Sequence, residues 1–249
     1  MLRNLGIVQA SFHLPRFRAN AMRRLGGRSL LEWVVRRVTD SMRLDGVIVV
    51  VCEPEDSRAV SHLVPSDVPV VHAEGEDALD RFTRALEQYQ AEGVVRVLGD
   101  NFFIDAGLID RLVTTAESHP NCDYVSYCSR DGRPAILSPV SVYAEWFRSS
   151  ALRKANRSAR DTLDREHVTR YLYSHPEKFN IRLTPAPTEI DRDDVRLTVD
   201  IEEDWDHALA IYEALGPELL DWQRIANLLN HQPALRSRMA VLNRVHAHA

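Results

Sequence analysis

The sequence predicts an α/β protein with a mostly parallel sheet covered by helices. Short apolar runs alternate with segments of helical periodicity along much of the chain, which is typical of βα repeats. Residues 47–51 are continuously β-branched, as expected for a strand buried on both faces. Of the 249 residues, 45% are hydrophobic and 27% are charged, so the chain can build a sizeable core.

The first half of the chain carries the clearest repeat. Ser29 is a suitable N-cap for the first helix, and Glu32 three residues later fits a capping box. A second helix is expected over residues 78–90 with Gly93 as its stop, and a third begins after Asp105. Strands are expected at residues 6–10, 47–51, 68–71, 94–98 and 123–127.

The second half is less regular. We expect a helix-rich stretch over residues 142–170, then strands at 178–183 and 195–199. A helix over 202–215 should end at Gly216, followed by helices over 218–229 and 235–245. We therefore divide the chain into a main domain over residues 1–216, with an acceptor or dimerisation insertion at 131–175, and a C-terminal helical extension over 217–249.

Composition argues against several classes of protein. The formal net charge is −5, so no overall positive field draws the protein to nucleic acid or to an anionic membrane. The three cysteines follow no metal-ligand spacing and indicate reduced thiols in a cytoplasmic protein. No apolar run is long enough to span a membrane, and the first residues lack a signal-peptide layout.

A possible phosphate site follows the first strand. Ligands of open parallel sheets bind beyond the carboxyl ends of the strands. The first strand ends at Gln9-Ala10-Ser11, and the next residues supply cations that could face a polyphosphate. The alternative is a solvated basic loop. The cations are Arg16, Arg18, Arg23 and Arg24.

Two aspartates follow expected strands. Asp100 comes after residues 94–98, and Asp200 comes after residues 195–199. If those strands are close, the two carboxylates can share a magnesium ion together with substrate phosphates. The alternative is that each aspartate caps a loop or a helix.

Glu166 and His167 place a carboxylate beside an imidazole. Adjacent residues of a helix do not share a face, which argues against a zinc site, and a hydrogen-bonding structural role for His167 is the simpler interpretation. The sequence contains no nucleophile elbow, Walker loop or C-x-x-C pair.

Six segments of the chain form a recognisable ordered set. They are residues 7–10 (IVQA), 25–34 (LGGRSLLEWV), 75–82 (GEDALDRF), 95–101 (VRVLGDN), 165–169 (REHVT) and 196–200 (RLTVD). In this order they resemble the cytidylyltransferase family, above all its spore-coat-polysaccharide branch, with sialic acid and KDO cytidylyltransferases as more distant relatives. The resemblance covers most of the chain.

This resemblance implies a nucleotidyltransferase domain with the nucleotide-diphospho-sugar transferase fold, which is GT-A-like and Rossmann-like. It implies magnesium-dependent attack of a sugar-acid hydroxyl, or of a related acceptor, on the α-phosphate of CTP, with release of pyrophosphate. It also implies a homodimer, to which we expect residues 142–173 to contribute through Val142, Trp146 and Phe147.

The resemblance also implies roles for individual residues. Asp100 and Asp200 would bind the metal, and Glu166 and His167 would lie in the acceptor half. The segment 75–82 would lie by the base and ribose. The nucleotide-binding residues would be Gln9, Ala10, Ser11, Gly75, Asp80 and Arg81, and the catalytic cations would be Arg16 and Arg18.

The triphosphate loop departs from the family pattern, which reads approximately Q-A-R-x-G-S-x-R-L-P-x-K. Without a gap, Ser11 replaces the arginine, His13 the glycine and Asn20 the lysine, while Arg16 stays in register. A gapped reading aligns residues 11–16 with S-x-R-L-P-x. In both alignments the glycine that eases backbone approach to phosphate is missing.

Three functions therefore remain open. The first is an active cytidylyltransferase with a divergent triphosphate loop. The second is a catalytically impaired relative that binds a nucleotide, a sugar or a protein partner. The third is a nucleotidyltransferase that uses another nucleotide or a non-sugar phosphate or phosphonate acceptor.

Overall fold

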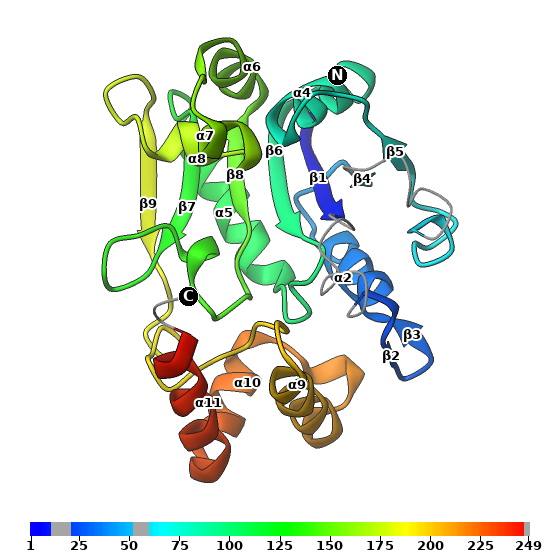
Figure 1. Ribbon diagram of the computed structural model, residues 1–249, viewed down its shortest axis with the longest axis vertical. Coiled ribbons are helices and arrows are strands. Elements are labelled where there is room, and N and C mark those ends of the chain that lie inside the picture. Colours follow the sequence, from blue (N-terminus) through cyan, green and yellow to red (C-terminus); the bar gives the residue numbers. More distant parts are fainter. Residues whose placement is uncertain (11–20, 52–59, 247–249) are drawn as a thin grey trace.

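A mixed β-sheet runs through the middle of the protein, with helices on both faces (Figure 1). The computed structural model describes residues 1–10, 21–51 and 60–246. Within them, the strands follow the order β5-β4-β1-β6-β8-β7-β9. The strands are β1 (Leu2–Ala10), β4 (Gly46–Val51), β5 (Val70–His72), β6 (Ala91–Leu98), β7 (Tyr124–Cys128), β8 (Glu145–Arg148) and β9 (Ile181–Pro185).

The sheet is parallel except at β8. Strand β1 pairs in parallel with β4 and β6, and β7 pairs in parallel with β9. Strand β8 lies between β6 and β7 and is antiparallel to both. The expectation of a mostly parallel sheet is thus confirmed.

Alternating side chains of the strands enter two separate apolar cores. Val8, Val49 and Val95 belong to the first core, whereas Ile7 and Ile48 belong to the second. Burial on both faces explains the unbroken apolar runs in the sequence. The first core is covered by α2 (Leu30–Thr39) and α5 (Ala106–Ser118), and the second by α4 (Ala78–Gln88), α6 (Ser149–Ser158) and α8 (Arg170–Tyr173).

A small hairpin, β2 (Arg24–Leu25) and β3 (Arg28–Ser29), leads into α2. Its two turn residues, Gly26 and Gly27, have φ of 57° and 83°, as a two-residue hairpin turn requires. Ser29 then caps α2 by accepting a hydrogen bond from the N–H of Glu32 at 3.1 Å, so the expected N-cap is confirmed.

Three local expectations are wrong. The stretch 142–170 is rich in helix, as expected, but it begins with strand β8. Its residues Val142, Trp146 and Phe147 are buried within the protomer, so these side chains cannot form the expected subunit contact. Gly93 does not stop a helix but lies inside β6. Residues 195–199 form no strand.

The last helices gather beyond the carboxyl ends of the parallel strands (Figure 1). They are α9 (Glu202–Leu215), α10 (Trp222–Asn230) and α11 (Pro233–His246). Leu220, Ile225 and Met239 pack in the same core as Val8 of β1. The C-terminal helices therefore share a core with the sheet.

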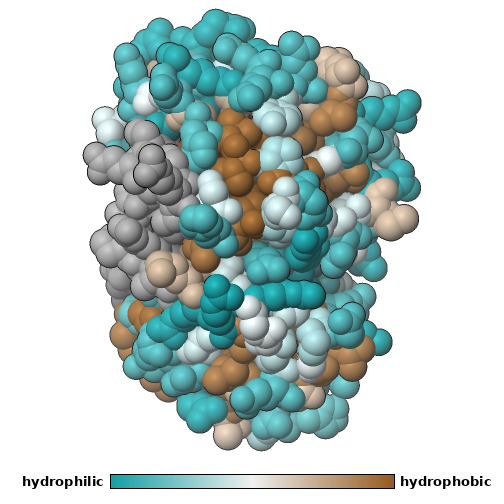
Figure 2. All heavy atoms as spheres, turned by 90° about the vertical axis from the view of Figure 1, so that its right-hand side faces the viewer, coloured by the Kyte–Doolittle hydropathy of each residue, from teal (hydrophilic) through white to brown (hydrophobic). Residues whose placement is uncertain are grey.

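The edge of the sheet at β5 is short and apolar. Figure 2 shows this side of the molecule, where apolar residues gather in the middle and hydrophilic residues surround them. Val71 of β5 is buried and Val70 is half-buried.

Among the described helices, none has the length and apolar character needed to cross a membrane.

Candidate active site

The ends of β1 and β6 lie side by side at the carboxyl edge of the sheet. Gln9 pairs in register with Leu98, and the N–H of Gly99 donates to the carbonyl of Gln9 at 2.9 Å. Gln9 and Ala10 are buried. Asp100, directly after Gly99, therefore lies in the turn next to the end of the first strand, where a ligand of such a sheet binds.

Of the expected phosphate loop, Ser11, Arg16 and Arg18 lie outside the described residues. Of the two cations that follow, Arg23 pairs with Glu202 at the start of α9 and stacks on Trp205, 4.9 Å from the ring centre. Arg24 donates to the carbonyl of Gly27 at 2.8 Å.

The two candidate metal ligands lie on different parts of the fold. Asp100 is half-buried and adjoins the end of β1. Asp200 lies two residues before the start of α9, whose Glu202 accepts from Arg23. The side chain of Asp200 is 27% exposed and lies 3.4 Å from the guanidinium of Arg196.

Partly exposed carboxylates of this kind are suitable ligands for magnesium when phosphates complete the coordination. Within the described part of the chain, no group of three or more His, Cys, Asp or Glu side chains could hold a metal on its own. A shared ion between Asp100 and Asp200 stays a prediction.

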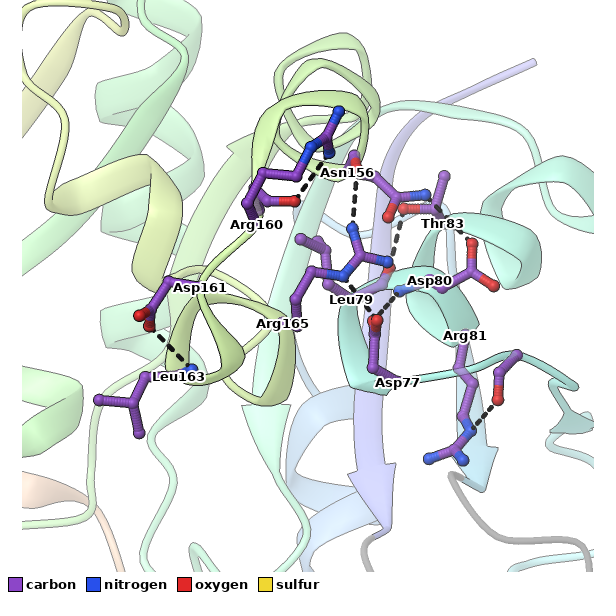
Figure 3. A network of polar contacts seen from close by, with 12 residues as sticks. Asp77, Leu79, Asp80, Arg81, Thr83, Asn156, Arg160, Asp161, Leu163 and Arg165 are labelled. Atoms are coloured by element: carbon purple, nitrogen blue, oxygen red, sulfur yellow. Dashed lines mark hydrogen bonds and ion pairs between the residues drawn. The ribbon is translucent and has the colours of Figure 1, made fainter.

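The segment 75–82 forms the start of α4 (Figure 3). Asp77 is the N-cap, and one carboxylate oxygen accepts from the N–H of Asp80 at 2.9 Å. The other accepts from the guanidinium of Arg165 at 2.5 Å. Arg81 donates back to the carbonyl of Gly75 at 3.1 Å. These contacts fix the start of α4 against the segment that carries Glu166 and His167.

Asp80 is held by two neighbours, Arg84 at 2.9 Å and the side-chain amide of Asn156 at 3.2 Å. Burial works to raise the pKa of Asp80, but the hydrogen bonds from Asn156 and Arg84 outweigh burial and leave this pKa lowered. The carboxylates of the N-cap Asp77 and of Asp80 in the first turn already neutralise the positive end of the helix dipole. The start of α4 thus suits a base or ribose better than a triphosphate.

Glu166 and His167 are both exposed. Glu166 ends the short helix α7 (Thr162–Glu166), and the backbone N–H of His167 donates to the carbonyl of Leu163 at 3.0 Å. Their neighbours in the sequence, Val168 and Thr169, are buried. The two side chains are thus presented outward from a fixed stretch of backbone.

A buried ionic cluster escaped the sequence analysis. Arg96 of β6 and Glu145 of β8 face each other across the sheet and form an ion pair. Arg96 also donates to the side-chain oxygen of Gln9 at 2.7 Å. Glu145 further accepts from Tyr124 at 2.6 Å and from Thr169 at 2.8 and 3.0 Å.

The cluster changes the pKa of one of its members, Tyr124. Burial first, and then the charge of Glu145, raise the pKa of Tyr124 well above its usual value, so this phenol stays a proton donor. A signal was available in the sequence: an arginine in the middle of a strand buried on both faces requires a buried counter-ion.

Comparison with known proteins gives matches over most of the chain. The cytidylyltransferase family model matches residues 5–232. The chain is 31% identical to the uncharacterized protein MJ1063 of Methanocaldococcus jannaschii, over 94% of this chain and 93% of the other. It is 27% identical to the spore coat polysaccharide biosynthesis protein SpsF of Bacillus subtilis, over 92% and 95% of the two chains.

A solved structure supports the fold. A cytidylyltransferase from Leptospira borgpetersenii superposes with a TM-score of 0.82 at 21% sequence identity, covering 94% of this chain and 97% of the other. The family match extends beyond Gly216 into α10. With a match over nearly the whole chain and the same arrangement of strands, this protein belongs to the cytidylyltransferase family.

Proposed function

We propose that the protein transfers CMP from CTP to a sugar acid or a related acceptor, with release of pyrophosphate, in the synthesis of a polysaccharide or surface glycan. The observation that carries the proposal is the family match over residues 5–232. The similarity to a spore coat polysaccharide biosynthesis protein supports the pathway.

In the proposed reaction, a hydroxyl oxygen of the acceptor attacks the α-phosphorus of CTP and forms a new P–O bond. The bond from the α-phosphorus to the bridging oxygen breaks, and pyrophosphate leaves with the electron pair. The hydroxyl proton passes to solvent or to a nearby base. Such a reaction depends mainly on positioning and on neutralising phosphate charge.

The residues divide into two sides. Gln9 and Ala10, at the end of β1, and the start of α4 with Gly75 and Arg81 would receive the nucleotide. Glu166 and His167 would face the acceptor. Arg16 and Arg18 would neutralise the triphosphate, with Ser11 at the same loop.

Magnesium would be held by Asp100 and Asp200, and it would supply positive charge between the phosphates. Their half-buried and partly exposed carboxylates fit a hard cation. The metal requirement can be measured by removing divalent ions with a chelator and restoring magnesium.

One observation favours a second function, a family member that binds a nucleotide, a sugar or a protein partner without transfer. Arg23 would otherwise compensate for the altered loop, but it is paired with Glu202. Fewer free cations weaken charge neutralisation at the triphosphate.

A panel of the common nucleoside triphosphates with magnesium, assayed by pyrophosphate release in the presence of sialic acid, KDO and phosphonate acceptors, separates the alternatives. We expect release with CTP and one acid acceptor. Calorimetric titration of CTP without acceptor reports binding alone. CTP binding without release supports the non-transferring function, and release with another triphosphate supports the third alternative. If the protein neither binds CTP nor releases pyrophosphate with any nucleotide, the proposed transfer is overturned.

We also propose a cytoplasmic homodimer. The support for a dimer is the resemblance to dimeric relatives. The apolar residues Val142, Trp146 and Phe147 give no support, because they are buried in the protomer. Light scattering at micromolar concentration is expected to give twice the mass of one chain, and the mass of a single chain would contradict the assembly.

A further inference from the structure

The stretch 165–169 is attached to the nucleotide side of the site at both of its ends. At one end, Arg165 pairs with Asp77 at 2.5 Å. Asp77 belongs to the start of α4, between Gly75 and Asp80. Arg165 also donates to the backbone carbonyl of Asn156 at 2.7 Å, so its guanidinium is held from two directions (Figure 3).

At the other end, Thr169 donates to the carboxylate of Glu145. Glu145 pairs with Arg96, and Arg96 donates to Gln9 at 2.7 Å. A continuous chain of polar contacts therefore joins Thr169 to Gln9, the second-last residue of β1. Its members are at most 8% exposed.

A buried ion pair is a weak source of stability, since well-packed apolar residues at the same positions often stabilise a protein as much or more. Fully satisfied buried networks do, however, specify one geometry. The carboxylate of Glu145 receives Arg96, Tyr124 and Thr169 at once, so it has one well-defined position. The fixed carboxylate of Glu145 holds Thr169 directly, and it holds Gln9 through Arg96.

We propose that Arg165 and Thr169 are positioning residues that fix the exposed Glu166 and His167 at a set distance from the nucleotide side, through Asp77 and through the Glu145–Arg96–Gln9 chain. The inference rests on the proposed function for its catalytic meaning. Its geometric part, the mechanical link between residues 165–169 and the end of β1, stands on the contacts alone.

The geometric part is tested first, by hydrogen exchange in the protein without ligands. Thr169→Val keeps the shape and removes the hydroxyl. We expect several-fold faster exchange in residues 163–173 and also at Gly99, whose N–H bonds to Gln9. Thr169→Ser restores the slow exchange at both places. Tyr127→Phe is the control, because it removes a buried hydroxyl that donates outside the Glu145 network, to the carbonyl of Leu108 at 3.1 Å, and it leaves Gly99 unchanged.

Faster exchange confined to residues 163–173 in Thr169→Val would overturn the link, because a merely local role of the hydroxyl predicts that result. Faster exchange at Gly99 in Tyr127→Phe as well would also overturn it. Neither result depends on whether the protein uses CTP.

The second anchor offers a variant that preserves the fold. Asp77→Asn keeps a good N-cap for α4 and removes the ion pair with Arg165. Asp221→Asn is its matched control, because Asp221 is likewise an N-cap, for α10, paired with an arginine, Arg224. We expect faster exchange at residues 163–169 in the first variant and no change there in the second.

The catalytic part is tested by steady-state kinetics with CTP, magnesium and the acceptor that supports release. Thr169→Val and Asp77→Asn should lower kcat by about 10- to 100-fold, as misplacement by about 1 Å does. KM for CTP should stay within a factor of about two in Thr169→Val, since a lost positioning contact acts on kcat. Tyr127→Phe and Asp221→Asn should behave as wild type.

Equal losses in Thr169→Val and Tyr127→Phe would show general weakening and would overturn the positioning role. If the wild type releases no pyrophosphate with any acceptor, the proposed function fails, and the exchange experiment alone decides whether the link exists.

Discussion

Asp200 and Asp204 are four residues apart, and their carboxylates have different surroundings. Asp204 is fully buried and forms a two-point pair with Arg196 at 2.7 and 2.9 Å. It also accepts from the backbone N–H of Asp200 at 2.9 Å. The side chain of Asp200 is 27% exposed. The buried aspartate therefore fixes the backbone, and the other carboxylate is partly exposed to solvent.

We expect Asp100→Asn and Asp200→Asn each to abolish turnover with little change in melting temperature, because both remove a charge from a partly exposed position. Pyrophosphate release and thermal unfolding measure the two effects. Asp206→Asn, an exposed residue of α9, is the control. Turnover near the wild-type level in either variant would contradict the metal assignment.

Asp204→Ala should instead lower the free energy of unfolding by about 3–5 kcal/mol, because the buried Arg196 loses its two-point partner and is left with the longer contact to Asp200 at 3.4 Å. Urea unfolding measures the change. Asp193, which is 94% exposed in its pair with Arg130, provides the comparison, and its replacement by alanine should leave stability unchanged. Similar small effects for both variants would show that the buried pair is dispensable.

At the scale of elements, the repeated strands and helices of the first half could be predicted, because each apolar run is long and buried on both faces. Strand β8 could not, since it has only four residues and starts with a charged Glu145 whose partner is distant in sequence.

Residues 195–199 were assigned wrongly for another reason. Val195, Leu197 and Val199 alternate and are buried, but the N–H groups of Leu197 and Thr198 bond to the carbonyl of Pro139 rather than to a strand.

The residues of the candidate site likewise divide into those that could be predicted from the sequence and those that could not. The end of β1 and Asp100 could be placed from the sequence, because parallel strands bring their carboxyl ends to one edge. The contacts of Arg165 and Arg96 join residues that are far apart in the sequence. Local pattern carries no information about such pairs, so they required the folded chain.

Gly93 gives a prediction for β6 and β8. A Cβ at this position would lie 2.4 Å from Nε1 of Trp146, which donates to Asn4 at 2.9 Å. We expect Gly93→Ala to cost about 1–3 kcal/mol in the free energy of unfolding, as overpacking does. Gly46 of β4 is the control, since a Cβ there meets nothing within 4 Å. Equal stability of the two variants in urea would contradict the close packing.

At the scale of the whole molecule, the C-terminal helices are joined to the sheet by a core that includes a buried histidine. His207 of α9 is 5% exposed, and its Nδ1 has no hydrogen-bond partner among the described residues. Burial, and then Arg238, lower the pKa of His207, while Asp204 and Asp206 act weakly in the opposite direction. Arg196 adds further repulsion.

Stability should therefore fall in mild acid. Below about pH 6.5 the histidine of the unfolded chain takes up a proton, whereas the folded protein resists it until the pH reaches the lowered pKa of His207. Between these values the unfolded state binds more protons, so the free energy of unfolding decreases as the pH decreases. Urea midpoints measured across this range should vary less in His207→Gln, and as in wild type in His231→Gln, an exposed position. An unchanged slope in His207→Gln would exclude this source.

The reversed strand β8 also governs when the sheet can be completed during synthesis. Strand β7 is translated before β8, yet it joins the sheet only through β8. Until residues 145–148 have left the ribosome, β6 presents an open row of backbone groups to other chains. A ribosome that pauses between β7 and β8 thus holds half a sheet with an exposed edge, and the speed of translation across this interval helps to determine how much of the protein escapes aggregation.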